Sequence, residues 1–226
     1  MNENEKKIMV HEKQWLQQCG IHAINNLLQL SKSDAVNETG KTNQKRVTIE
    51  EMNQISDELT HRELKILSND YDKNNDEVYH RLSLLDKWKS HHRTPIFGNY
   101  SYEALEMALH RRNARLIRYT QKQDRKIVLG YLLNIKTETL SLLQYIPFLR
   151  NSRHWYCISK VVIKHDSESK KMNGTQLMES ENVSWNVIDS KASQITVLRS
   201  ITELDEYLFD IQNSKGEVFT VLPKNE

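Results

Sequence analysis

Apolar residues recur with helical spacing at several places along the chain. The most regular stretch follows Cys19, and its apolar positions are Ile21, Ala23, Ile24, Leu27 and Leu28. A period near 3.6 residues is typical of an amphipathic helix, so we predict a helix over residues 18–30. Three later helices are predicted where Thr48, Ser101 and Thr202 precede similar patterns, because hydroxyl side chains cap helix N-termini.

Strand-like runs dominate the second half of the chain. They are rich in β-branched and aromatic residues. The runs cover residues 114–119, 127–135, 154–163, 185–188 and 218–222. We expect 154–163 and 185–188 to pair as antiparallel strands, which places the start of the first beside the end of the second. Helices followed by strands in this way predict an α+β fold with a mostly antiparallel sheet.

Two polar segments interrupt these patterns. Residues 61–93 are highly charged but keep some helical spacing, so we expect a protruding helical arm that either contacts substrate or is a decorative insertion. Residues 166–182 have no period and are interpreted as a flexible excursion between the paired strands. The chain is therefore predicted to form one domain over 11–222, with an arm at 1–10 and a short tail at 223–226.

Charge and cysteine content narrow the class of protein. The chain has 32 basic and 30 acidic side chains, a net charge of +2, so nothing in it demands nucleic acid or an anionic membrane. No stretch approaches the ~20 apolar residues of a membrane span, and the charged N-terminus lacks a signal-peptide core. Two cysteines exclude a disulfide framework and a Cys/His zinc site. We expect a monomer in the cytoplasm or nucleus.

Cys19 is the candidate nucleophile. It stands at the start of the predicted helix 18–30, where unpaired backbone N–H groups and the helix dipole favour an anion. A thiol in such a place, most of all beside a protonated histidine, is readily converted to the reactive thiolate. Gln14, five residues earlier, carries an amide that can donate to the same site. Cys157 lies in a strand-like run, and we expect it to be a buried, inert thiol.

A base and an orienting carboxylate are available on the two paired runs. His154 opens the first run and Asp189 follows the second. If the runs pair as predicted, these side chains are cross-strand neighbours at one end of the sheet. The aspartate then fixes the imidazole tautomer and stabilises the imidazolium, as in other nucleophile–base–orienter triads. His22, three residues after Cys19, is an alternative base without a strand-borne orienter, and we expect structural roles for it and for His11.

Six short motifs accompany these residues. They are His-Glu-Lys-Gln at 11–14, Cys19 with His22, Asn-Asn-Leu-Leu-Gln at 25–29, Gly-Asn-Tyr at 98–100, Arg-His-Trp at 153–155 and Asp-Ser-Lys at 189–191. Together they resemble the Josephin-domain cysteine proteases, which are deubiquitinases of papain-like architecture. The resemblance runs from about residue 10 to 222, and the last three motifs match the short single-domain Josephin proteins best.

The resemblance implies a papain-like α+β fold, with a helical subdomain packed on the sheet and a Josephin domain over residues 11–222. It implies Cys19 as nucleophile, Gln14 as oxyanion donor, His154 as general base and Asp189 as orienter. The implied reaction is hydrolysis of isopeptide or peptide bonds after the C-terminal glycine of ubiquitin. Ubiquitin or ubiquitinated proteins are the expected partners, and no cofactor or metal is needed.

The apolar connection Leu140–Leu149 lies ahead of His154. We expect it to form a buried loop or a wall of the substrate channel, because binding residues are often on loops. The predicted substrate contacts are Leu142, Leu143 and Trp155. Two other functions remain open at this point. One is a weakly active ubiquitin-binding module, and the other is a papain-like thiol protease or acyltransferase that acts on other peptides.

Overall fold

The computed structural model describes residues 11–12, 18–29, 46–70, 92–93, 100–136, 153–163 and 182–224. The helices in these parts are α1 (Cys19–Leu28), α2 (Ile49–Asp70), α4 (Tyr102–His110) and α5 (Ile201–Asn213). The strands are β1 (Ala114–Arg118), β2 (Gly130–Lys136), β3 (Arg153–Ile163), β4 (Asn182–Ile188), β5 (Thr196–Leu198) and β6 (Glu217–Pro223).

The strands form a single six-stranded sheet in the order β1-β6-β2-β3-β4-β5. Every neighbouring pair is antiparallel, so the predicted α+β class with a mostly antiparallel sheet is confirmed. β3 pairs with β4 as the sequence predicts, with Cys157 opposite Ile188. The strand expected from residue 127 begins at Gly130, where a Cβ would lie 2.3 Å from the Ile158 carbonyl oxygen. A side chain at Gly130 would push the central strands apart.

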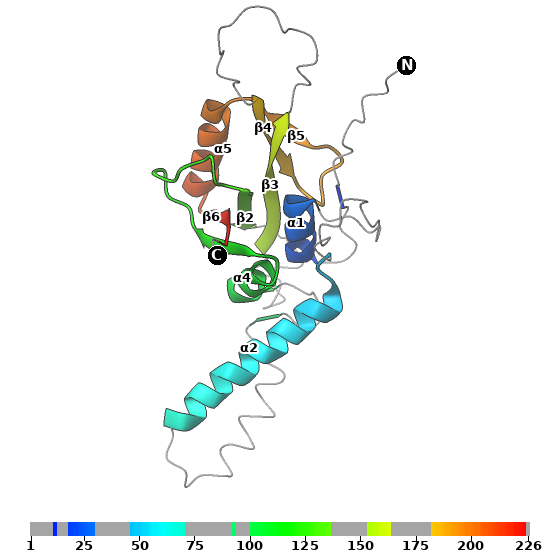
Figure 1. The fold of residues 1–226 in the computed structure, drawn as a ribbon, viewed down its shortest axis with the longest axis vertical. Coiled ribbons are helices and arrows are strands. Elements are labelled where there is room, and N and C mark those ends of the chain that lie inside the picture. The colour runs from blue at the N-terminus through cyan, green and yellow to red at the C-terminus, as the bar shows by residue number, and fades with distance from the viewer. Residues whose placement is uncertain are drawn as a thin grey trace, which may run out of the picture.

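Hydrophobic cores cover both faces of the sheet. Consecutive residues of β2 alternate between them: Leu132 packs with α1 and α4, whereas Leu133 packs with α5. This alternation follows from the two-residue repeat of a strand. Figure 1 shows α1 and α5 on opposite sides of the sheet, with α1 beside β3. Each fully buried Leu or Ile contributes ~1.5–3 kcal/mol, so these two layers are the main source of stability.

Local signals account for three of the helix starts. The Thr48 hydroxyl accepts from the backbone N–H of Glu51 at 3.2 Å, and Ser101 accepts from Ala104 N at 3.3 Å. At α5 the capping residue is Ser200, whose hydroxyl accepts from Glu203 N at 3.1 Å. The predicted cap at Thr202 is therefore wrong by two residues, because Ser200 is the residue with extended backbone and Thr202 lies inside the helix.

α2 runs outward from the body of the molecule (Figure 1). Its first half packs into the core, where Met52 and Ile55 are fully buried, while Ile66 farther along the helix is 63% exposed. Arg112 holds this first half to α4 through hydrogen bonds of 2.9 and 2.6 Å to the Glu51 carboxylate. The first part of the predicted 61–93 arm is thus helical, as the continuation of α2, and residues 71–91 lie outside the described parts.

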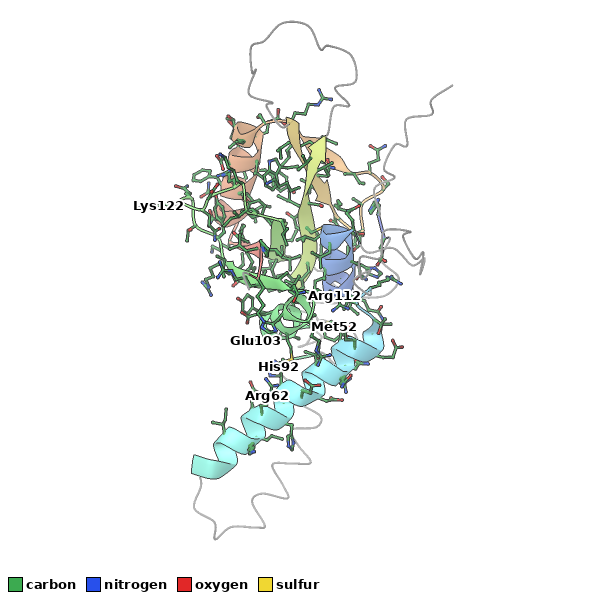
Figure 2. All side chains as sticks on the ribbon, viewed as in Figure 1. Met52, Arg62, His92, Glu103, Arg112 and Lys122 are labelled. Carbon is green, nitrogen blue, oxygen red and sulfur yellow. The ribbon has the colours of Figure 1, made fainter. Side chains whose placement is uncertain are left out.

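A histidine joins α2 to the start of α4. His92 is 3% exposed, and its Nδ1 lies 2.9 Å from the Ser101 hydroxyl, while Nε2 lies 3.0 Å from Glu63. Figure 2 shows His92 at this junction, with Met52 and Arg112 nearby. Among the described helices, none has an uncharged apolar stretch long enough to cross a bilayer.

Candidate active site

Cys19 is the first residue of α1, as predicted, and it is only 2% exposed. The carbonyl of Gln18 accepts the first bonds of the helix, from Ile21 N and His22 N, at 3.1 and 3.3 Å. Gln18 makes no side-chain capping bond, so tertiary packing holds this helix end in place. Gly20 assists, because a Cβ there would lie 2.9 Å from Leu105 Cδ2, and its absence lets α1 approach α4 closely.

His154 and Asp189 meet at one end of the β3–β4 pair. The imidazole Nε2 lies 2.7 Å from Asp189 Oδ1, a short hydrogen bond in which Nε2–H donates to the carboxylate. The register explains the contact: Cys157 pairs with Ile188 at the end of β4, so the next residue, Asp189, leaves the sheet near the start of β3, where His154 lies. The two side chains that the strand pattern predicts as neighbours are therefore brought together.

The Cys19 side chain also interacts with this imidazole, and this interaction contributes to the pKa of His154. Asp189 holds Nε2, so Nδ1, which is buried and has no hydrogen-bond partner among the described residues, is the nitrogen left for proton transfer. Burial alone would lower the pKa of His154, but the hydrogen bond to Asp189 and the interaction with Cys19 outweigh it and raise that pKa. The pair of contacts therefore stabilises the imidazolium, which is the partner that a thiolate needs.

Asp189 is held in its ionised form. Burial would raise the pKa of its carboxyl group, yet hydrogen bonds from His154 and from the backbone N–H of Lys191 lower it below the usual value. The Lys191 N–H donates to Oδ1 at 2.8 Å, and Ala192 N donates to the Asp189 carbonyl at 3.0 Å. A tight turn directly after β4 thus fixes both the backbone and the carboxylate of this residue.

A buried polar cluster lies behind α1. Glu12, whose side chain is 6% exposed, accepts from Arg46 Nη2 at 2.7 Å and from Asn25 Nδ2 at 3.3 Å, and His22 Nδ1 lies 3.1 Å away. Burial would raise the pKa of Glu12, but the contacts with His22, Arg46 and Asn25 lower it. The backbone N–H of Glu12 also donates to Asn26 Oδ1 at 2.7 Å. His22 is therefore part of this cluster, in agreement with the structural role expected for it.

A thiol at a helix start, an imidazole and an aspartate in this order can support nucleophilic acyl transfer. The sequence model of the family described as Josephin matches residues 14–222, which include all three. The chain belongs to the Josephin family. A Josephin-like protein of Drosophila melanogaster is 24% identical over 222 residues, covering 94% of this chain and 72% of that protein. The papain-like α+β fold expected from the motifs is the fold of this family and is confirmed.

Three predicted site residues of this Josephin domain, Gln14, Leu142 and Leu143, lie outside the described parts. Trp155 lies in the core between the sheet and α1, 4% exposed, with its ring centroid 5.7 Å from that of Phe219. Packing accounts for its position, and we do not propose it as a substrate contact. Cys157 is fully buried and donates to Ile188 O, and burial raises the pKa of its thiol far above the usual value.

Sequence reasoning missed two sets of contacts around the candidate triad. Tyr156 stacks on the His154 ring, with centroids 6.0 Å apart and planes 17° apart, and its hydroxyl lies 3.2 Å from that of Tyr207 on α5. His11 Nε2 donates to the Asp189 carbonyl at 3.0 Å. The alternation of β3 could have identified Tyr156, but no local pattern indicates a contact between residues 178 positions apart.

Within the described parts, no group of His, Cys, Asp and Glu side chains is arranged to hold a metal ion. The three residues of the candidate triad come from three different places in the fold. Cys19 is the first residue of α1, His154 lies in β3, and Asp189 directly follows β4. The candidate nucleophile Cys19 is on the helical side of the Josephin domain, and His154 and Asp189 are on the sheet side. Proton transfer between the Cys19 thiol and the His154 imidazole therefore depends on how the helical side and the sheet side are aligned.

Proposed function

We propose that this Josephin domain is a cysteine-type deubiquitinase that hydrolyses the bond after the C-terminal glycine of ubiquitin. The observation that carries the proposal is the chain of contacts from Cys19 to His154 to Asp189, set at a helix start. Membership of the Josephin family supports ubiquitin as the substrate class. We assign Gln14 to the oxyanion on the strength of its motif, and propose a cytoplasmic or nuclear monomer.

In the first half of the proposed reaction, the Cys19 thiolate attacks the carbonyl carbon of the ubiquitin glycine. The C–N bond then breaks, and His154 transfers its Nδ1 proton to the departing amine, which leaves an acyl-enzyme thioester. Asp189 stays ionised and keeps the second imidazole proton on Nε2, so that Nδ1 faces the thiol throughout.

In the second half, His154 is neutral and acts as a general base. Its Nδ1 takes a proton from a water molecule, and the resulting hydroxide attacks the thioester carbonyl. The C–S bond breaks and the thiolate–imidazolium pair is restored. Ubiquitin leaves as the carboxylic acid, which loses its proton to solvent. Backbone N–H groups at the start of α1 and the Gln14 amide would stabilise the oxyanion in both halves.

Cleavage of ubiquitin–aminomethylcoumarin tests the proposal directly. The wild-type protein should release the dye and should form a covalent adduct with ubiquitin propargylamide at Cys19. Cys19→Ala and His154→Ala should abolish turnover, whereas His22→Ala should retain measurable turnover. A dead His22→Ala with an active His154→Ala would show that the base is assigned to the wrong residue.

The same assay separates the alternatives. Equal cleavage of a short Arg-Gly-Gly peptide on the same dye would favour a general thiol protease, because remote contacts should raise the rate only for the whole protein. Ubiquitin binding without turnover of either substrate under reducing conditions would favour a binding module.

The pH profile provides a second test of the triad. Asp189 helps to raise the pKa of His154, so its carboxylate extends the pH range over which the imidazolium survives. Asp189→Asn should lower the His154 pKa and move the alkaline limb of kcat/KM to lower pH, while Asn still holds the ring and leaves part of the activity. An alkaline limb that does not move would show that Asp189 does not act through His154.

A further inference from the structure

The two residues His11 and Glu12 contact both sides of the site at once. His11 Nε2 donates to the backbone carbonyl of Asp189 at 3.0 Å, which is the sheet side. Glu12 binds the nucleophile helix, through its backbone N–H to Asn26 Oδ1 at 2.7 Å and through its carboxylate to His22 and Asn25. Because the residues are adjacent in sequence, a single peptide unit joins the sheet side to the helix side.

Several further bonds hold the helix side of this link in place. The Glu12 carboxylate forms an ion pair with Arg46, and Asn25 accepts from Val47 N at 2.9 Å and donates to Val47 O at 3.1 Å. Asn26 Nδ2 also donates to the Glu12 carbonyl at 3.4 Å. Glu12 is 8% exposed and Asn25 and Asn26 are fully buried, so these bonds are shielded from water. The position of Glu12 relative to α1 is therefore fixed.

The sheet side depends on a turn, because Asp189 lies one residue beyond β4. Within that turn, Ala192 N donates to the Asp189 carbonyl. The His11 ring adds a second donor to the same carbonyl, and this donor comes from the helix side of the molecule. A carbonyl oxygen accepts two such bonds with its two lone pairs, and the geometry requires the His11 proton on Nε2.

We propose that His11 and Glu12 act as a positioning clamp for the reaction proposed above, on which this inference rests. His11 fixes the backbone of Asp189. The Asp189 carboxylate in turn fixes the orientation of the His154 ring. Glu12 fixes the same peptide unit to α1, and thereby to Cys19. Neither residue touches the reacting atoms. Their effect is the alignment of thiol and imidazole, where a displacement of ~1 Å can cost ~10²-fold in rate.

The test compares His11→Ala and His11→Gln with His61→Ala, which removes an exposed histidine on α2. His11→Ala should lower kcat for ubiquitin–aminomethylcoumarin by ~10- to 100-fold, leave KM within about threefold, and keep the melting temperature close to that of His61→Ala. His11→Gln should recover most of the activity, because its amide nitrogen can reach the same carbonyl. Equal activity of His11→Ala and His61→Ala, or no recovery by His11→Gln, would overturn the clamp.

A double-mutant comparison identifies the route of the effect. If His11 acts through Asp189, His11→Ala should cause little further loss in an Asp189→Ala background. The same fold-loss in both backgrounds would contradict that route. Glu12→Gln gives a second variant, which keeps the shape of the side chain and removes its charge toward Arg46; it should also lower kcat more than it changes KM.

Alkylation keeps the clamp testable if ubiquitin turns out not to be the substrate. The rate at which iodoacetamide carbamidomethylates Cys19, followed by peptide mapping between pH 5 and 9, requires no substrate at all. His11→Ala should reduce this rate in the range where the thiolate–imidazolium pair exists, and His11→Gln should restore it. An unchanged profile in His11→Ala would refute the clamp, whereas failure of the wild-type protein to cleave ubiquitin would refute only the proposed function.

Discussion

The helices α1 and α2 lie close together in the chain but are stabilised in different ways. α1 has ten residues, nine of them buried, with no side-chain cap at Gln18 and no charged residue in its first or last turn. α2 has 22 residues, a Thr48 cap, and two glutamates in its first turn, and its outer half is largely exposed. Local signals support α2, whereas α1 depends on its surroundings, and α1 is the helix that carries Cys19.

The contrast has a physical reason. A helix of ten residues is marginal in isolation, so its position is set by whatever packs around it. Packing fixes a side chain within fractions of an ångström, because core atoms interdigitate with few voids. A nucleophile that must face an imidazole benefits from this kind of support. The outer half of α2 carries no such requirement, and its charged surface is free to meet solvent.

The largest expected difference comes from equal truncations in the two helices. Ile24→Ala in α1 removes a side chain with no exposed surface and should destabilise the protein by ~2–5 kcal/mol. Ile66→Ala in α2 removes a side chain that is 63% exposed and should stay within ~0.5 kcal/mol of wild type. Urea unfolding midpoints measure both. Similar losses for the two variants would show that the outer half of α2 is packed against something.

The next comparison uses two glutamates whose pKa is lowered for different reasons. Hydrogen bonds from His22, Arg46 and Asn25 overcome burial at Glu12, whereas exposed Glu50 is held by backbone and Thr48 contacts at the start of α2. Glu12→Gln should cost ~1–3 kcal/mol at neutral pH, since buried partners lose a charged acceptor. Glu50→Gln should cause a much smaller change, because its contacts are in water.

The sign of the pH dependence follows from the lowered pKa of Glu12. Its contribution is complete above the usual glutamate pKa of ~4.3 and disappears as the pH falls through the lower folded value. The stability gap between wild type and Glu12→Gln should therefore narrow toward acid pH, in unfolding curves recorded at a series of pH values. A gap that stays constant with pH would show that Glu12 acts through its shape alone.

The smallest expected effect concerns the helix caps. Thr48→Ala removes a hydroxyl that accepts from Glu51 N and should destabilise by about 1 kcal/mol. Gln18→Ala removes no capping bond, so its effect on the unfolding midpoint should be only a few tenths of that. Melting temperatures of Thr48→Ala and Gln18→Ala, measured by thermal unfolding, show which variant is less stable. A larger loss of stability in Gln18→Ala than in Thr48→Ala would indicate that the Gln18 side chain stabilises the start of α1.

The elements that could be predicted from sequence are those with a strong local signal. Caps at Thr48 and Ser101, the helical period after Cys19 and the strand run from His154 all lie where the patterns placed them. The strand around Trp185 begins three residues earlier than predicted, at Asn182, which the sequence pattern assigns to the flexible excursion. β5 was not predicted, because three residues give too short an alternation, and two of them are exposed. Its pairing with β4 depends on a neighbour already in place.

The candidate site divides in the same way. The contact between His154 and Asp189 follows from strand pairing, so the sequence could predict it. The bond from His11 to Asp189 and the cluster around Glu12 depend on segments that meet only in the folded chain, and no periodicity encodes them. The opening motif His-Glu-Lys-Gln at 11–14 indicated that these residues matter, but it gave no indication of which atoms they bind.

The place of β6 in the sheet has a consequence for synthesis. β6 covers Glu217–Pro223, and it separates β1 from β2 by pairing with both. β1 precedes β6, the only described strand that pairs with it, by roughly 100 residues. Because the ribosome adds ~5–20 residues per second, β1 is made several seconds before β6. During that interval β1 and the open edge of β2 are unpaired templates for other chains. Nascent protein should therefore depend on chaperones until β6 is inserted.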